Sequence, residues 1–169
     1  MDPEWQETFR QRMGRFKAQS MFERDSVPVS IKIRVTSGCF HREHSPRAYS
    51  LIDHYMAGLC FDEFGFEEHE SGPEVLVHLA VATAALSLAK SVIELVVEII
   101  RARSAGIKQG DHPSEPLELI VRRMDDKKQL REEIVLSIGH TDRIVKKKVE
   151  EQLREALRRI TDSERRGGI

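Results

Sequence analysis

Residues 27–35 read Val-Pro-Val-Ser-Ile-Lys-Ile-Arg-Val, and this stretch decides the fold. Apolar and other residues alternate along it without a break, which is the pattern of a half-buried β-strand. We therefore predict a strand with one face in the core and the opposite face in contact with solvent. The two faces are Val27, Val29, Ile31, Ile33 and Val35 on one side and Ser30, Lys32 and Arg34 on the other.

Three more segments have the composition of strands. Residues 59–68 contain three phenylalanines, which favour a strand over a helix. Residues 117–123 and 133–138 are short runs rich in branched apolar residues, and the polar segment 125–128 separates them. This arrangement predicts an antiparallel hairpin with a loop longer than the tightest type.

Four helices are expected around this sheet. A short one covers about 46–58, with Ser45 as its N-cap and Pro46 in its first turn. A long apolar helix is predicted over 73–103, since proline and an acid at positions 73 and 74 are typical of a first turn. Apolar residues four apart predict the other two helices. These are Trp5, Phe9, Met13, Phe16 and Met21 within 2–24, and Val145, Val149, Leu153, Leu157 and Ile160 after a cap at His140 or Thr141.

The predicted fold class is α+β. We expect a mixed or antiparallel sheet of three to four strands, packed by the long apolar helix and the C-terminal helix. Residues 26–162 would form a single domain, residues 1–25 an amphipathic helix that is a candidate interaction segment, and residues 163–169 a frayed tail. The chain has 169 residues, with 27 Lys+Arg against 28 Asp+Glu, and this balance argues against a dedicated nucleic-acid binder.

The location of the protein is predicted from its N-terminus and its apolar run. No basic segment followed by an apolar one opens the sequence, so we expect a cytoplasmic protein. Residues 75–89 lack charge, but 15 residues are fewer than the roughly 18–20 that cross a bilayer. A buried core helix is the preferred interpretation, and a membrane-active or membrane-anchored subunit that uses helix 73–100 is the alternative.

Cys39, His41 and His44 form the one cluster with the composition of a metal site. Its spacing matches no familiar zinc motif, and Arg42 and Arg47 add positive charge beside it. We therefore predict no metal and no cofactor. A fourth ligand would come from His54, Cys60 or His69.

The sequence contains no glycine-rich phosphate loop and no nucleophile elbow, and its paired acids suit solvation better than catalysis. We therefore predict a non-enzymatic protein that has no catalytic residues and no small-molecule substrate. Its partner would be another protein or copies of itself. The acid-rich segment 61–74 and the basic residues of the last helix could pair within the fold, between copies or with a partner.

Two groups of residues are the candidates for partner binding. The aromatic stripe of the first helix either packs on its own core or contacts a partner, and we expect the partner contact because aromatic side chains supply large contact areas. The basic residues of the last helix are the second group. The candidate residues are Trp5, Phe9, Phe16, Lys146, Lys147 and Arg158.

The expected order is strand, short helix, strand, long apolar helix, two strands and helix. This order of elements resembles that of the effector-associated constant component modules of bacterial conflict (antiphage) systems. Those modules also have an apolar helix that ends in arginine-rich turns, here Ile99-Ile100-Arg101-Ala102-Arg103. The resemblance covers about residues 27–160 and rests on layout. The aromatic N-terminal helix and the long loop before the hairpin depart from that pattern. The resemblance implies an adaptor or assembly module of a bacterial multi-protein system, with defence systems included, and it carries over no catalytic residues.

Overall fold

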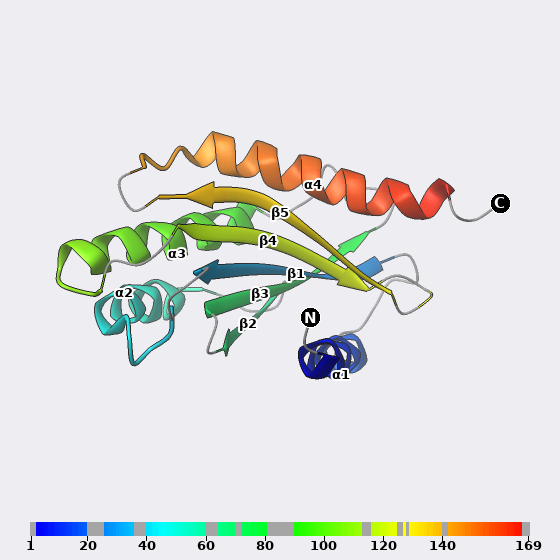
Figure 1. Cartoon of the computed structure of the whole chain (residues 1–169), viewed down its shortest axis with the longest axis horizontal. Coiled ribbons are helices and arrows are strands. Elements are labelled where there is room, and N and C mark those ends of the chain that lie inside the picture. The colour runs from blue at the N-terminus through cyan, green and yellow to red at the C-terminus, as the bar shows by residue number, and fades with distance from the viewer. Residues whose placement is uncertain are drawn as a thin grey trace.

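The computed structural model describes residues 3–19, 26–35, 40–59, 64–69, 72–80, 90–112, 116–124, 127, 129–139 and 142–166. Five strands form one antiparallel sheet in the order β2-β3-β1-β4-β5 (Figure 1). The strands are β1 (Ser26–Val35), β2 (Phe64–His69), β3 (Gly72–Ala80), β4 (Leu117–Met124) and β5 (Leu130–Ile138). The helices are α1 (Pro3–Gln19), α2 (Pro46–Met56), α3 (Lys90–Lys108) and α4 (Lys146–Arg166). The α+β class is confirmed, and the described sheet has five strands rather than three or four.

The strand predicted over 27–35 is confirmed as β1, the middle strand of the sheet. Ile31 and Ile33 lie in the main core, as the alternation requires. The expectation that the opposite face of β1 would be wet is wrong, because Ser30 and Lys32 are also buried. Alternation shows that the two faces of a strand differ in polarity, but it does not show whether another element covers the polar face.

The continuous helix predicted over 73–103 is also wrong. Its first part is strand β3, which pairs with β1 on one side and β2 on the other, and α3 begins at Lys90. A strand between two neighbours and covered on both faces reads as a continuous apolar run, as a buried helix does. Val75 and Val77 lie in the main core, whereas Leu76 packs on the opposite face. The alanine-rich residues 81–89 lie outside the described part of the chain.

Pro73 and Gly72 belong to the start of β3 rather than to a helix start. Pro73 pairs with Glu68 next to the two-residue connection between β2 and β3. Gly72 has a φ of +116°, and an added Cβ would run into the carbonyl oxygen of Ile33. Glycine is therefore required at the start of β3, where the backbone lies against the Ile33 carbonyl of β1.

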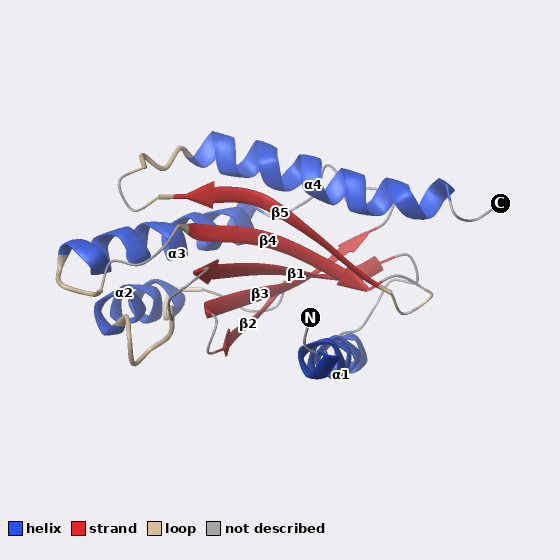
Figure 2. Cartoon of the chain, viewed as in Figure 1, coloured by secondary structure: helices blue, strands red, loops and turns tan. Residues whose placement is uncertain are grey.

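Helices α2, α3 and α4 pack on one face of the sheet and enclose the main core, and α1 packs on the other face (Figure 2). The predicted short helix is confirmed as α2, which ends at Met56, and Pro46 lies in its first turn. Ser45 occupies the N-cap position, but its side chain makes no capping hydrogen bond and its hydroxyl accepts one from Arg103 instead. Asp111, which follows α3, accepts a hydrogen bond from the backbone N–H of Ala48 at 3.2 Å. It therefore satisfies one of the free N–H groups that begin α2.

The predicted hairpin is confirmed as β4 and β5, which pair in antiparallel register. The last helix begins at Lys146, and Val149, Leu153, Leu157 and Ile160 line its buried side as predicted. Val145 was expected on that side, but it precedes the helix and is 50% exposed. His140 and Thr141, the predicted caps, lie outside the described residues. The helix continues to Arg166, into the segment expected to fray.

None of the helices in the described ranges is long and apolar enough to cross a membrane. The helix that the membrane alternative required is interrupted, since residues 72–80 form strand β3.

Replacing Ile33 with alanine should lower the free energy of unfolding by about 2–4 kcal/mol, because it removes fully buried methyl groups from the central strand and leaves a cavity. Urea unfolding at neutral pH measures the loss. The matched change Ile33→Val should cost only about 1 kcal/mol. Equal effects of the two substitutions would show that Ile33 does not pack as described.

Candidate interaction surfaces

Helix α1 packs on the polar face of the sheet through a second, smaller apolar cluster. Phe9 and Met13 of α1 contact Leu76 of β3, and Met124 and Leu130 lie at the edge of this cluster. Phe9 is buried here in the protein's own core, so the expectation that it faces a partner does not fit its position. The side chains of Trp5 and Phe16, the other two residues of the stripe, lie outside the described part of the structure. Their role as a partner surface therefore stays a prediction.

A network of buried charges lies beside this cluster and is centred on Glu74, whose side chain is 0% exposed. Arg12 of α1 donates to Oε2 of Glu74 at 2.6 Å and to Oε2 of Glu67 at 2.6 Å. The hydroxyl of Ser30 donates to Oε1 of Glu74. His69 Nε2 lies 3.3 Å from Oε2 of the same carboxylate. The network thus ties α1 to strands β1, β2 and β3.

The surroundings of Glu74 keep it ionised. Burial alone would raise its pKa, but the nearby His69 imidazole, the positive charge of Arg12 and the hydrogen bonds from Ser30 and Arg12 outweigh burial and lower the pKa to about 2. Lys32 lies on the same sheet face and is 7% exposed. Burial lowers the pKa of Lys32 to about 8, although the charge of Glu74 opposes this shift. The negative charge of Glu74 and the positive charges of Arg12 and Lys32 therefore stabilise one another in the buried network.

Acid should destabilise the fold through Glu74. Because its pKa is lower in the folded state than in the unfolded chain, its contribution is complete above about pH 4.5 and is lost as the pH falls toward 2. We expect a loss on the order of 3 kcal/mol from this group across that window. Urea unfolding between pH 6 and pH 2.5 measures it. The variant Glu74→Gln should show a shallower dependence, and an unchanged slope would contradict the ionised carboxylate.

The predicted metal-like cluster is partly assembled. The ligand atoms of His41, Glu43 and His44 lie within 4.8 Å of one another, and the two imidazole rings are 4.2 Å apart. The backbone N–H of Glu43 donates to Nδ1 of His41 at 3.2 Å, which leaves the proton of a neutral ring on Nε2. Metal ligation by His41 would have to break this hydrogen bond or displace that proton.

The other residues considered for that metal cluster do not complete it among the described residues. His54 is exposed on α2, and His69 belongs to the Glu74 network. Cys39 and Cys60 lie outside the described part of the chain. The absence of a metal therefore stays a prediction.

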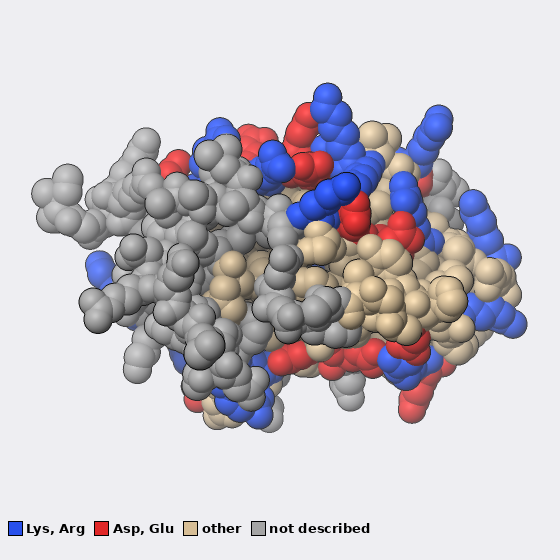
Figure 3. Space-filling model, turned by 180° about the vertical axis from the view of Figure 1, so that it is seen from behind, with Lys and Arg blue, Asp and Glu red and all other residues tan. Residues whose placement is uncertain are grey.

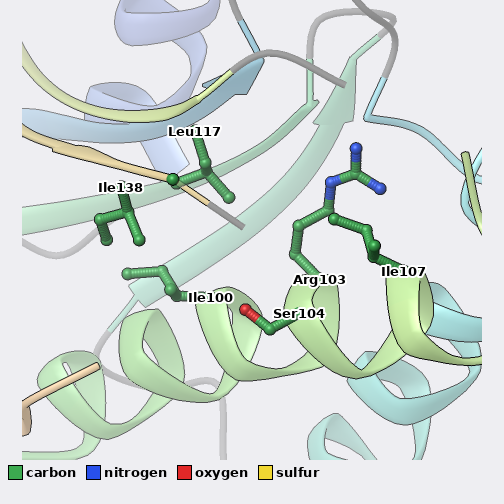
Figure 4. A pocket seen from close by; sticks show the side chains of 7 residues that line it. Ile100, Arg103, Ser104, Ile107, Leu117 and Ile138 are labelled. Atoms are coloured by element: carbon green, nitrogen blue, oxygen red, sulfur yellow. The ribbon is translucent and has the colours of Figure 1, made fainter. Parts of the chain in front are cut away.

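A small pocket lies between α3 and the ends of β4 and β5 (Figure 4). The side chains of Ile100, Leu117 and Ile138 converge on it, while Arg103 runs past it. Its volume is about 10 Å³, which is room for about one water molecule. This pocket cannot hold a substrate-sized ligand.

The basic residues of α4 stand where a helix usually has acids. Lys146, Lys147 and Lys148 form its first turn, which contains no acidic residue, so their charges oppose the positive end of the helix dipole. Lys146 pairs with Glu94 of α3 at 3.1 Å. Lys147 is 3.9 Å from Glu151, and both of their side chains are largely exposed. This turn is therefore a site of concentrated positive charge.

The acid-rich segment of the sequence has other partners within the described structure. Glu67 binds Arg12, and Glu68 binds Arg42, whose guanidinium also contacts Asp53. Further along α4, Arg158 is exposed and Arg159 pairs with Glu133 of β5. Figure 3 shows the face opposite to that of Figure 1, with basic and acidic side chains interspersed along the upper edge and a row of acidic ones, flanked by basic ones, along the lower edge. The described salt bridges do not join the acid-rich segment to the basic residues of α4.

A recess of about 270 Å³ lies between the end of β5 and the start of α4. We call it the β5–α4 recess. Figure 1 shows that β5 ends and α4 begins at the same end of the molecule. Its lining is Leu136, Ser137, Ile138, Asp142, Arg143, Ile144, Val145, Lys148 and Val149.

The sequence alone did not identify this recess. It singled out Lys146 and Lys147, which flank it, but not Arg143 and Lys148, which line it. The available signal was the run of three lysines at a helix start, where charge should be unfavourable. The Glu74 network was also missed, because no motif links Arg12 with Glu74.

No protein-family model matches this sequence, and searches of curated proteins and of solved structures likewise found no match.

Proposed function

We propose that this chain is a non-enzymatic interaction module, an adaptor or assembly component of a bacterial multi-protein system. The observation that supports it most directly is the basic first turn of α4 beside the β5–α4 recess. Lysines in that turn cost stability, about 0.3–1 kcal/mol each by their interaction with the helix dipole. Glu94 and Glu151 already pair with Lys146 and Lys147, and a partner's negative charge would offset the cost at Lys148, which makes no salt bridge among the described residues.

The exposed apolar surface at the same place supports a protein partner. Val145 is half exposed at the mouth of the recess, next to the three lysines. Apolar centres with a polar rim are typical of protein interfaces. Membership of a conflict (defence) system rests on the resemblance in layout. The structure modifies that layout at one element, since strand β3 occupies the first part of the expected long helix.

The proposal is tested with the intact chain and the products of genes adjacent to its own. Size-exclusion chromatography with light scattering should show a complex with at least one of these proteins, or a concentration-dependent oligomer of the chain itself. Isothermal calorimetry then measures the affinity. A chain that remains a monomer in every mixture would contradict an adaptor role.

A further inference from the structure

We propose that the β5–α4 recess binds an extended, acidic segment of a partner protein in which acidic and apolar residues alternate. This inference rests on the proposed function and specifies the kind of partner. It is carried by three properties of the recess: its apolar walls, its net positive charge and its position beside the edge strand.

The walls of the recess are suited to an apolar side chain. Ile138 and Val149 are buried and lie behind it, whereas Val145 at its mouth is half exposed. A volume of about 270 Å³ is slightly below the range of roughly 300–1,000 Å³ that ligand sites occupy. It accommodates one or two side chains of a peptide rather than a large cofactor.

The charged lining favours a carboxylate. Arg143 and Lys148 supply two positive charges, and Asp142 supplies the one negative charge. An oxygen of Asp142 accepts the backbone N–H of Gly139 at 2.7 Å, so this carboxylate already stabilises the turn after β5. Lys146 and Lys147 lie beside the recess but are paired with Glu94 and Glu151, so the excess of positive charge comes from Arg143 and Lys148. The net charge therefore attracts acidic groups and repels basic ones.

The position of the recess favours an extended segment. Leu136, Ser137 and Ile138 are consecutive residues of β5, and β5 is the outermost strand on its side of the sheet. An edge strand offers backbone groups to a further strand, and such a strand directs alternate side chains to opposite faces. A segment that alternates acidic and apolar residues can then present one kind to the lysines and the other to the apolar walls.

The test uses the full chain labelled with ¹⁵N and a synthetic six-residue peptide that alternates glutamate with valine, blocked at both ends. We expect the amide signals of Ser137, Ile138 and Lys148 to shift on titration. A second peptide with glutamine in place of glutamate should bind at least about tenfold more weakly, because it lacks the charges that the recess attracts. Raising the salt concentration should weaken binding of the glutamate peptide but not binding of the glutamine peptide.

Matched charge reversals locate the site. Lys148→Glu should lower the affinity for the glutamate peptide by about tenfold, since it replaces an attraction with a repulsion. Lys127→Glu reverses an exposed lysine in the turn between β4 and β5 and should leave the affinity unchanged. Thermal unfolding of both variants shows whether they remain folded. If Lys148→Glu unfolds, Lys148→Ala replaces it, with a smaller expected loss of affinity.

Several outcomes would overturn the inference. They are the absence of peptide binding, equal affinity for the two peptides, and equal losses from both charge reversals. Tighter binding of inorganic phosphate or of a short single-stranded DNA would show a general anion site or a nucleic-acid site instead. If a partner complex forms and Lys148→Glu leaves it intact, the inference fails while the adaptor role stands.

Discussion

Replacing Glu74 with alanine should lower the free energy of unfolding by about 3–5 kcal/mol, among the largest effects of a single substitution in this protein. Glu74 is fully buried, accepts hydrogen bonds from Arg12 and Ser30 and lies 3.3 Å from His69, so its loss leaves the buried Arg12 with Glu67 as its described carboxylate and removes the negative charge that faces Lys32. Removing one partner of a buried ion pair costs more than removing both, since the remaining charge stays out of water. Urea unfolding at pH 7, followed by circular dichroism, measures the effect.

In the Glu74→Ala variant, Lys32 and Arg12 should respond differently to a rise in pH. Burial already lowers the pKa of Lys32 to about 8, and loss of the carboxylate removes the charge that raised it. Lys32 can therefore lose its proton, whereas the guanidinium of Arg12 cannot. We expect the Glu74→Ala variant to recover part of its stability as the pH rises from 7 to 9.

A double-mutant cycle separates the ion network from the packing. Lys32→Met in the Glu74→Ala background should recover 1 kcal/mol or more, on the order of the coupling expected for neighbouring charges. Glu74→Gln keeps the shape of the side chain and removes its charge, so it is the matched control. A loss below about 1 kcal/mol for Glu74→Ala, with no coupling to Lys32, would contradict a buried network.

The comparison of sequence with structure is most informative at β3. Val-Leu-Val-His-Leu at 75–79 alternates weakly, and its neighbours on both sides are apolar, so period two and period 3.6 are equally compatible with it. The deciding fact is that β3 is covered on both faces and lies between β1 and β2. Such burial depends on contacts distant in sequence. In β1, by contrast, Lys32 and Arg34 alternate with apolar residues, so the period of two is visible in the sequence itself.

The candidate site was predictable to a smaller extent than the fold. Lys146 and Lys147 were singled out by charge alone, and they flank the recess. The recess itself needs β5 and α4 side by side, which no local pattern specifies. Arg12 and Glu74 are 62 positions apart, and each resembles an ordinary surface residue in the sequence. Long-range pairs of this kind become visible only when the strand order is known.

Phe40→Ala should also cost about 3–5 kcal/mol, and its effect bears on the loop in which the sequence suggested a metal cluster. The ring of Phe40 is fully buried and packs edge-on against Tyr49, with centroids 5.4 Å apart. The guanidinium carbon of Arg103 lies 5.2 Å from the ring centroid, and the Tyr49 hydroxyl donates to the Phe40 carbonyl at 3.2 Å. These contacts anchor the loop that carries His41 and His44.

Phe40 and a bound metal make opposite predictions for that loop. If Phe40 anchors the loop, Phe40→Ala lowers the melting temperature strongly, and Phe40→Leu lowers it less because most of the apolar volume remains. A chelator then changes the melting temperature of none of the three proteins, which are the native chain and the two variants. If an ion held the loop, a chelator would destabilise the native chain by several kcal/mol, since binding energy at a structural zinc site is folding energy. Differential scanning calorimetry of the three proteins, each with and without a chelator, measures this difference. A chelator effect comparable to that of Phe40→Ala, and absent from a His41→Ala variant, would show that His41 helps to hold a metal, because side-chain packing alone does not respond to chelation.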